Sequence, residues 1–354
     1  MSASSAARVE STSPTFDIAA AVKANAEVAS GAKDMVWLTP FASSEGTGNE
    51  MIFFVKPEVA SEKGVDMTAC LNVVDAAFRQ HNVSVDAIGV LGAPCLKAHN
   101  IIGGHYGVIN QISRLGRKAL VGDTAKKFEA DFAAELQAGA KVLGGHEILE
   151  SYPFMSAESL GVLVDALFPS SKKIAPGTYG LAFNMFAEKV IALNGFHPYQ
   201  LLNFYNPGRS MIVMLVRTNT SWADMRDKLV GATNPLKAEA GSIRQTFLAR
   251  QKELGIPVVS QANNGVHLSA GPIEAMFEII RFCSDYKTGK MIAADQTRMG
   301  RLLKAAGVAE DKIQALGANP LLKTADKVIS TFDLTEMQEP QQAVDALKTH
   351  VGQL

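Results

Sequence analysis

Residues 51–91 have the pattern of a strand, a helix and a second strand, and this order most restricts the fold. Residues 51–56 (MIFFVK) form an apolar run typical of a buried strand, which ends at Pro57, a residue without an amide hydrogen for a β-ladder. Apolar side chains recur at helical spacing in residues 68–80, and residues 83–91 are again rich in β-branched residues. Because this order is the first half of a split β-α-β unit, the sequence predicts an α/β domain.

The same kind of pattern returns much later in the chain. Residues 211–216 (MIVMLV) predict another buried strand, and residues 221–230 and 272–283 predict amphipathic helices. Between the two α/β segments, residues 95–195 have a mostly helical pattern broken by glycine and proline. The sequence therefore predicts an α/β domain that is interrupted by an insertion.

Composition and charge exclude several classes of partner. The 354 residues include 34 basic and 35 acidic side chains, so no net field attracts nucleic acid or an anionic membrane. No apolar run approaches the roughly 18 residues that a membrane-spanning helix needs. The three cysteines form no CxxC pair, which fits a reducing compartment. We expect a cytoplasmic protein, with an organellar matrix as the second choice, and no transit or signal peptide in residues 1–33.

Three segments carry residues suited to phosphate chemistry, although the chain has no GxxxxGK[ST], GxGxxG, HExxH or zinc-ligand spacing. The segments are residues 55–58 (VKPE), residues 231–235 (GATNP) with 241–244 (GSIR), and residues 264–269 (NGVHLS) with Glu278. They offer lysine, threonine and arginine as phosphate donors and a histidine as the nucleophile. Phosphoryl transfer needs such donors to spread the charge of the moving group, and neutral imidazole accepts a phosphoryl group near pH 7.

Each of these residues also has a plainer interpretation. Lys56 and Arg244 could be ordinary charged residues at the surface. His267 could be a structural histidine, and Glu278 could lie on a solvated helix face. Thr233 belongs to an ordinary turn sequence. Only their joint occurrence favours a functional site.

Taken in order, the segments resemble the nucleoside diphosphate kinase family, over about residues 51–91 and 196–284. Residues 198–205 are similar to the family's nucleotide-edge helix. The matching pieces are Lys56-Pro57-Glu58 for Lys-Pro-Asp, residues 231–235 for Gly-x-Thr-Asn-Pro, Ser242-Ile243-Arg244 for Thr-Ile-Arg, Asn264 to Ser269 for Asn-x-x-His-Gly-Ser apart from Leu268, and Glu278 for the helical glutamate.

The resemblance implies a ferredoxin-like α/β fold, with a four-stranded antiparallel sheet and helices on one face. It also implies homo-oligomers, or here a subunit of a larger assembly. The expected organisation is a flexible extension (1–33), the first half of the kinase-like domain (34–94), a mostly helical insertion (95–195), the second half (196–287) and a helical C-terminal extension (288–354).

The resemblance further implies that His267 takes the γ-phosphoryl group from a nucleoside triphosphate such as ATP, bound with Mg²⁺, and passes it to a nucleoside diphosphate. Mg²⁺ would be carried by the phosphates, with no metal ligand from the protein. The other implied site residues are Lys56 and Arg244 for the transferring phosphoryl group, Thr233 for the β-phosphate region, Asn264 for the ribose, Glu278 and Ser269 for holding the histidine ring, Phe196 for stacking on the base, Leu201 on the edge helix, and Arg226 as a second arginine.

Two departures from the family, together with the long insertion and the added terminal segments, favour an alternative. The family has an arginine four residues before the glycine of GATNP, where this chain has Asp227, and Arg226 comes one residue earlier, a rotation of about 100° on an α-helix. Leu268 replaces a glycine beside His267. The alternative function is a kinase-like domain without catalysis that serves as a scaffold or a nucleotide-binding subunit of a larger complex.

Overall fold

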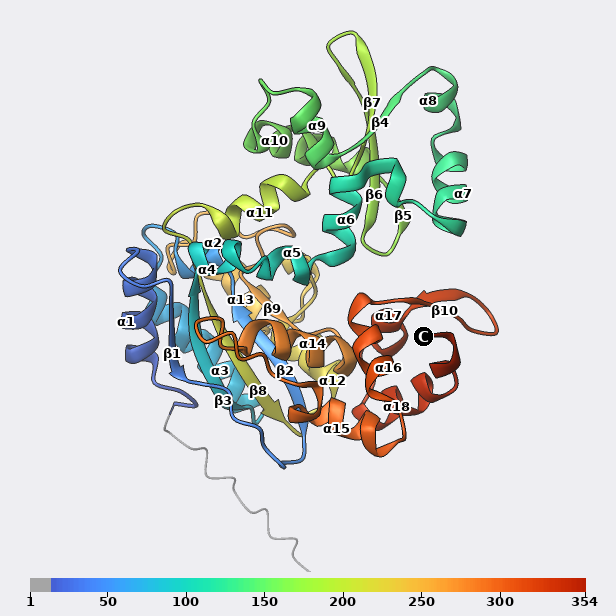
Figure 1. Cartoon of the computed structure of the whole chain (residues 1–354). Helices are drawn as coiled ribbons and strands as arrows, with labels where there is room; N and C mark the ends of the chain where they lie inside the picture. Colours follow the sequence, from blue (N-terminus) through green and yellow to red (C-terminus); the bar gives the residue numbers. More distant parts are fainter. Residues whose placement is uncertain (1–13) are drawn as a thin grey trace, which may run out of the picture. The chain divides into compact units, whose positions relative to one another are not determined.

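The computed structural model describes residues 14–354, which divide into two compact units. Unit 1 consists of the described residues up to Cys95 together with Pro207–Leu354, and unit 2 consists of Leu96–Asn206 (Figure 1). The expected insertion ended at residue 195, whereas the second unit continues to residue 206. Among residues 14–354, every helix is too short or too polar to span a bilayer.

Unit 1 is built on a five-stranded antiparallel sheet with the strand order β1-β3-β8-β2-β9. The strands predicted at 51–56, 83–91 and 211–216 are confirmed, with bounds that differ by one or two residues. The two outer strands were not predicted. The strands are β1 (Met35–Thr39), β2 (Asn49–Val55), β3 (Ser84–Gly92), β8 (Ser210–Thr218) and β9 (Val266–Leu268).

Helices cover both faces of this sheet. Successive residues of a strand point to opposite faces. In β2, the Phe53 ring lies 5.0 Å from that of Phe78, while the Phe54 ring lies 5.3 Å from that of Phe282. Phe78 belongs to α3 (Met67–Gln80) and Phe282 to α14 (Pro272–Cys283), both close to their predicted bounds. The expectation of helices on one face only is therefore wrong.

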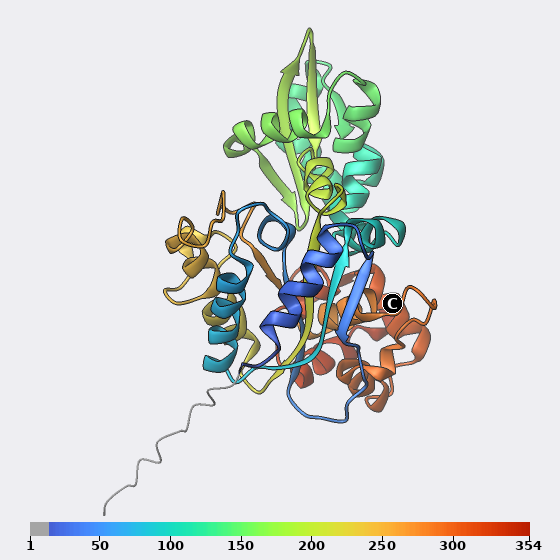
Figure 2. The same cartoon turned by 90° about the vertical axis from the view of Figure 1, so that its left-hand side faces the viewer.

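The expected flexible N-terminal extension is in part an ordered helix. Its residues 1–13 lie outside the described part of the chain, but Ile18–Ala29 form α1, which packs against β3 and α3 (Figure 2). The Asp17 side chain caps the helix by accepting from the Ala20 amide at 2.9 Å. The buried stripe consists of two alanines, an asparagine and a valine, which make a weak apolar signal, so the sequence indicated at most a weakly helical segment here.

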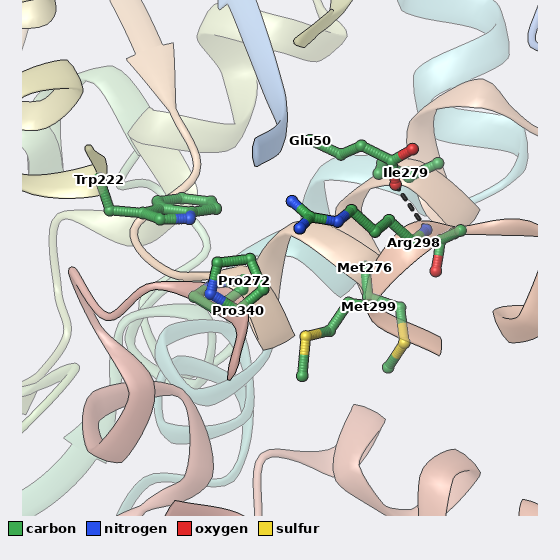
Figure 3. A pocket seen from close by; sticks show the side chains of 9 residues that line it. Glu50, Trp222, Pro272, Met276, Ile279, Arg298, Met299 and Pro340 are labelled. Atoms are coloured by element: carbon green, nitrogen blue, oxygen red, sulfur yellow. Dashed lines mark hydrogen bonds between the residues drawn. The ribbon is translucent and has the colours of Figure 1, made fainter. Parts of the chain in front are cut away.

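The C-terminal segment packs on the outer side of α14. Ile273 and Met276 of α14 share a core with Leu303 and Val344, and Figure 3 shows the adjoining region. The Arg298 amide donates to Glu50 of β2 at 2.7 Å. The segment contains α15 (Arg298–Ala305), α16 (Glu310–Ala315), a hairpin of β10 (Leu321–Lys323) and β11 (Val328–Ser330), α17 (Thr331–Thr335) and α18 (Pro340–Lys348).

Unit 2 contains a four-stranded sheet that the expected mostly helical insertion did not include. Its strand order is β4-β7-β6-β5, with β4 parallel to β7 and the other pairs antiparallel. The turn between β6 and β7 uses Phe186 at a φ of 55°, so the glycine or asparagine that usually marks a hairpin is missing. The strands are β4 (Lys141–Gly144), β5 (Lys172–Ala175), β6 (Thr178–Met185) and β7 (Glu188–Leu193).

Helices surround the sheet of unit 2. The helix α11 (His197–Tyr205) packs against α10 and α9, which is why the second unit extends beyond residue 195. The Ser156 side chain caps α10 by accepting from the Ser159 amide. The main helices are α6 (Gly107–Leu115), α7 (Gly122–Asp131), α8 (Ala133–Gln137), α9 (Gly145–Ser151) and α10 (Ala157–Leu167).

Candidate active site

His267 lies on β9, at the edge of the sheet of unit 1. It pairs with Phe54 of β2, and the two rings stack with centroids 4.4 Å apart and planes 17° from parallel. The histidine side chain is 16% exposed. Strand pairing therefore fixes the position of the ring, and the remaining exposure leaves a part of it accessible.

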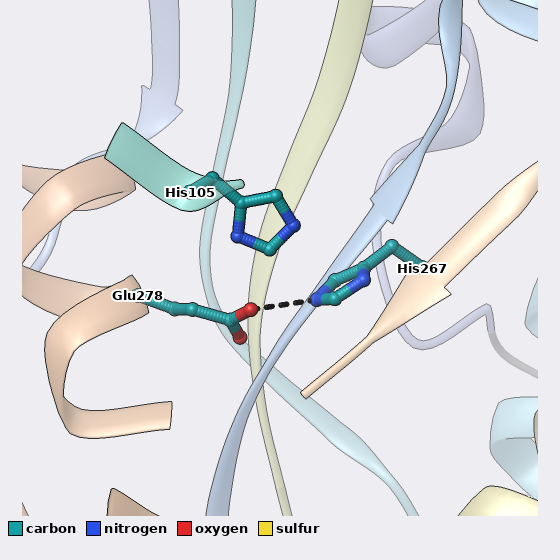
Figure 4. A group of neighbouring side chains, drawn as sticks. All are labelled: His105, His267 and Glu278. Atoms are coloured by element: carbon teal, nitrogen blue, oxygen red, sulfur yellow. Dashed lines mark hydrogen bonds and ion pairs between the residues drawn. The ribbon is translucent and has the colours of Figure 1, made fainter. Parts of the chain in front are cut away.

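A carboxylate and a hydroxyl hold the edge of the His267 ring. Nε2 of His267 lies 2.8 Å from Oε1 of Glu278, a fully buried residue of α14 (Figure 4). The other side chain drawn there, His105, belongs to unit 2. The Ser269 hydroxyl donates to Oε2 of Glu278 and accepts from the Ile52 amide at 2.8 Å. With the Nε2 proton directed at Glu278, the lone pair of the ring is on Nδ1.

Three positive side chains surround the same histidine. Burial holds the pKa of His267 well below its usual value, and the charges of Arg226, Lys56 and Arg244 lower this pKa further. The imidazole is therefore neutral at pH 7, the form in which a histidine acts as a nucleophile.

Lys56 follows β2 directly and precedes the short helix α2 (Pro57–Ala60). Its Nζ donates to Oδ1 of Asn264 at 2.8 Å, and Nδ2 of Asn264 donates to the carbonyl of Thr233 at 3.2 Å. Burial lowers the pKa of Lys56 to about 8, an effect that Glu58 opposes and Arg244 adds to. The ammonium group is thus desolvated but still mostly charged at pH 7.

Arg244 is buried and connects two of the predicted segments. It belongs to α13 (Ile243–Ala249), its Nη1 donates to the carbonyl of Gly231 at 2.7 Å and its Nη2 to that of Val266 at 3.0 Å. The arginine holds the loop of residues 231–235 beside the strand that carries the histidine. Thr233 in this loop is exposed.

A π-helix places Arg226 differently from the α-helix that the sequence suggested. Met225–Val230 form a π-helix, and the Gly231 amide donates to the carbonyl of Arg226 at 3.1 Å, five residues back instead of four. Arg226 thus occupies the position that Asp227 would have in an α-helix. Its Nη1 donates to the carbonyl of Leu268 at 2.7 Å, next to the histidine.

The two residues that favoured an inactive domain point away from the histidine. Leu268 pairs with Phe53 and is fully buried in the core on the α3 face, because neighbours on a strand alternate between faces. Asp227 is exposed, and its charge raises the pKa of Lys228 together with the larger contribution of Asp224.

The structure brings together Lys56, Arg226, Arg244, Asn264, His267, Ser269 and Glu278, all in unit 1. The predicted base-stacking residue Phe196 and the edge-helix residue Leu201 belong to unit 2, where the ring centroid of Phe196 lies 6.0 Å from that of Tyr179 and Leu201 is buried. Asn264 is also buried, and its amide group serves Lys56 and the Thr233 carbonyl, so a ribose contact stays a prediction.

Sequence reasoning missed two neighbours of the site. Phe54 supplies the surface on which His267 stacks, and it could have been found because it lies two residues before Lys56, near the end of the strand that Lys56 follows. Glu336, whose Oε1 lies 3.8 Å from Nη2 of Arg226, comes from the C-terminal segment and carries no sequence signal.

Comparisons with known proteins complete the description of the chain. No family model matches it, and no curated protein does either. Among solved structures, it is similar to an NDP kinase from Pyrobaculum aerophilum, with 17% sequence identity over 68% of this chain and 98% of that chain, and a TM-score of 0.33. A TM-score this low is not evidence of a shared fold.

Proposed function

We propose that this chain is a nucleoside diphosphate kinase-like phosphotransferase in which His267 carries the phosphoryl group. The observation that supports this most is the environment of one imidazole. Its Nε2 is held by a fully buried glutamate, its pKa is held low, and the charges of two arginines and one lysine act on it. A structural histidine needs no such group of partly desolvated cations, whose burial costs stability.

The proposed reaction has two half-reactions at one nitrogen. Nδ1 of His267 attacks the γ-phosphorus of a nucleoside triphosphate, and the bond from this phosphorus to the bridging oxygen breaks, so the nucleoside diphosphate leaves with that electron pair. A second diphosphate then attacks the phosphohistidine through a terminal oxygen and restores the imidazole. Mg²⁺ is part of the substrate here and travels with the phosphates.

The protein supplies positioning and charge. Glu278, supported by Ser269, accepts a hydrogen bond from the Nε2 proton of His267. Its negative charge stabilises the positive charge that develops on the ring when Nδ1 is phosphorylated. Lys56, Arg226 and Arg244 counter the charge on the phosphoryl oxygens. Asn264 acts as a positioning residue because it fixes the Lys56 ammonium group.

We also propose that unit 1 is a ferredoxin-like fold with one added strand. Four strands support this assignment, since β2 and β3 are joined by α3, β8 and β9 are joined by helices, and their order is β3-β8-β2-β9 with all pairs antiparallel. The arrangement is that of a β-α-β-β-α-β unit, and β1 extends its edge.

The alternative, a scaffold without catalysis, loses two of its motives in this structure. Leu268 points into the core on the opposite face, and the π-helix brings Arg226 beside Leu268's carbonyl. The scaffold role therefore needs support other than these two residues.

The test is the formation of phosphohistidine. The full chain is mixed with Mg²⁺ and ATP labelled on the γ-phosphate, and acid-labile, alkali-stable label is measured. His267→Ala removes the nucleophile, and His350→Ala, at the end of α18, serves as the matched control. Label on the parent and on His350→Ala but not on His267→Ala is the expected result. Label that persists in His267→Ala, or a folded parent that acquires none, contradicts the proposal.

A further inference from the structure

The turn between α17 and α18 lies directly against the segment that follows His267. The Met337 amide donates to the carbonyl of Ala270 at 2.9 Å. A Cβ atom added to Gly271 would lie 2.5 Å from the carbonyl oxygen of Thr335 and 3.0 Å from Cα of Glu336. Met337 itself has a φ of 56°, a conformation that non-glycine residues rarely adopt. The backbone thus holds Glu336 at a defined place beside the site.

Glu336 shares Arg226 with the site. Its Oε1 lies 3.8 Å from Nη2 of Arg226, while Nη1 of the same arginine donates to the carbonyl of Leu268 at 2.7 Å. The side chains of Arg226 and Glu336 are 19% and 44% exposed. The pair is therefore a loose, partly hydrated ion pair, of the kind that contributes little stability.

The other acidic neighbour favours its neutral form. Glu274 of α14 accepts from the Ala270 amide at 3.0 Å. Burial and the nearby charge of Glu278 raise the pKa of Glu274 well above its usual value. A carboxyl group with a raised pKa compensates Arg226 less than a charged carboxylate would. Glu278 in turn is engaged by His267 and Ser269, so Glu336 is the carboxylate left to oppose the arginine.

We propose that Glu336 is a displaceable counter-ion of Arg226, so that the C-terminal segment sets the affinity of the site for polyphosphate. This inference rests on the proposed function of the site. Phosphate oxygens carry more charge than one carboxylate and accept two parallel hydrogen bonds from a guanidinium group. The phosphates of a bound nucleotide therefore displace Glu336 as the partner of Arg226. Until then the carboxylate lowers the positive potential that attracts the substrate.

The test compares Glu336→Gln with Glu310→Gln in the full chain. Both variants remove one negative charge from the C-terminal segment, but the exposed Glu310 lies on α16. Binding of Mg²⁺-ATP is measured by calorimetry, and KM and kcat are measured for phosphoryl exchange. Glu336→Gln is expected to bind ATP about two- to fivefold more tightly, the factor for an exposed ion pair. It should lower KM similarly with kcat within about twofold of the parent, and Glu310→Gln should match the parent.

Two further measurements separate a specific role from a structural one. In an Arg226→Gln background, Glu336→Gln should have no effect, because the carboxylate acts through this arginine. The gain in affinity should also shrink in about 1 M salt, where exposed charges are screened.

Each outcome bears on one proposal or on both. Exchange that is intact in the parent and equal ATP affinity in Glu336→Gln would overturn the counter-ion role and leave the proposed function standing. If the parent binds no ATP but the Glu336→Gln variant does, the counter-ion role is supported. The contact between Glu336 and Arg226 is then strong enough to inhibit binding. If neither folded protein binds ATP, the proposed function fails and the counter-ion role fails with it.

Discussion

Leu268 and His267 are adjacent in the chain, yet their side chains lie on opposite faces of the sheet. Leu268 is fully buried in the core beneath α3, and His267 stacks on Phe54 on the face covered by α14. A side chain next to the histidine therefore does not crowd the site. The leucine that departs from the resembled motif contributes to the stability of the domain.

Restoring glycine at position 268 should consequently be harmful. We expect Leu268→Gly to lower the free energy of unfolding by about 3–5 kcal/mol, since it removes a buried side chain and adds backbone freedom. The rate per folded molecule should not rise. Denaturant titration together with exchange assays measures both quantities, and Leu268→Val is the milder control. A faster enzyme after Leu268→Gly would show that the leucine does obstruct the site.

Replacing Lys56 should separate activity from stability. Burial of its ammonium group lowers its pKa to about 8, so the charge is a cost to the folded state. We expect Lys56→Met to reduce the exchange rate by about 10²–10³, the scale for losing one charge donor in the transition state. The same variant should be more stable than the parent by roughly 1–3 kcal/mol, because each pKa unit corresponds to about 1.4 kcal/mol and the lost hydrogen bond to Asn264 offsets part of the gain. An active or less stable Lys56→Met variant would contradict this assignment.

The pH profile should show the state of two groups. Since the pKa of His267 is well below its usual value in the folded protein, the unfolded chain binds more protons in acid. The stability contribution of this residue is therefore full above about pH 6.5 and declines as the pH falls below that value. The rate should be highest near neutral pH and below, reach about half of that value near pH 8 and fall further above it, as Lys56 loses its proton.

NMR titration of the His267 ring and exchange rates measured between pH 5 and 10 check this profile. Lys56→Arg is the matched variant, because arginine keeps its charge above pH 8. If its rate falls at the same alkaline pH as that of the parent, another group is responsible for the decline.

Deleting Asp227 tests the role of the π-helix. With one residue fewer, Arg226 comes four residues before Gly231, and an α-helical turn can replace the π turn. The deletion variant should fold with a free energy of unfolding within about 1 kcal/mol of the parent and keep its exchange rate within a few-fold. Arg226→Gln in either chain should lower kcat/KM by about 10- to 100-fold, as expected for losing a charge donor. Loss of exchange in the deletion variant alone would mean that Arg226 is placed by something other than the helix register.

The elements that sequence reasoning identified are those with a long, regular apolar period. The strand β2 is buried along its whole length, and α3 and α14 have clear apolar stripes. The three-residue strand β9 is too short to have a period, and only the residue types suited to phosphate chemistry and the family resemblance drew attention to its segment. The sheet of unit 2 stayed hidden because the turn between β6 and β7 lacks a glycine signal and its outer strands are half exposed.

The candidate site shows the same division. His267, Glu278 and Ser269 are close in sequence and were assigned from one motif, and the structure places their side chains in contact. The π turn that positions Arg226 depends on hydrogen bonds that composition does not reveal. Glu336 is distant in sequence and reaches Arg226 only through the packing of the C-terminal segment on α14.

The division of unit 1 into two pieces has a consequence for synthesis on the ribosome. The strand β2, with every residue buried, pairs with β8 and β9, which follow it only after all of unit 2 has been made. At 5–20 residues per second, β2 must wait roughly 10–40 s for its second neighbour. Until β8 has been made, an apolar strand has both edges unpaired, and one edge stays unpaired until β9 follows, a condition that promotes aggregation. Unit 2 is continuous in sequence and can fold meanwhile, so the nascent chain passes through a state in which unit 2 is complete and unit 1 is not.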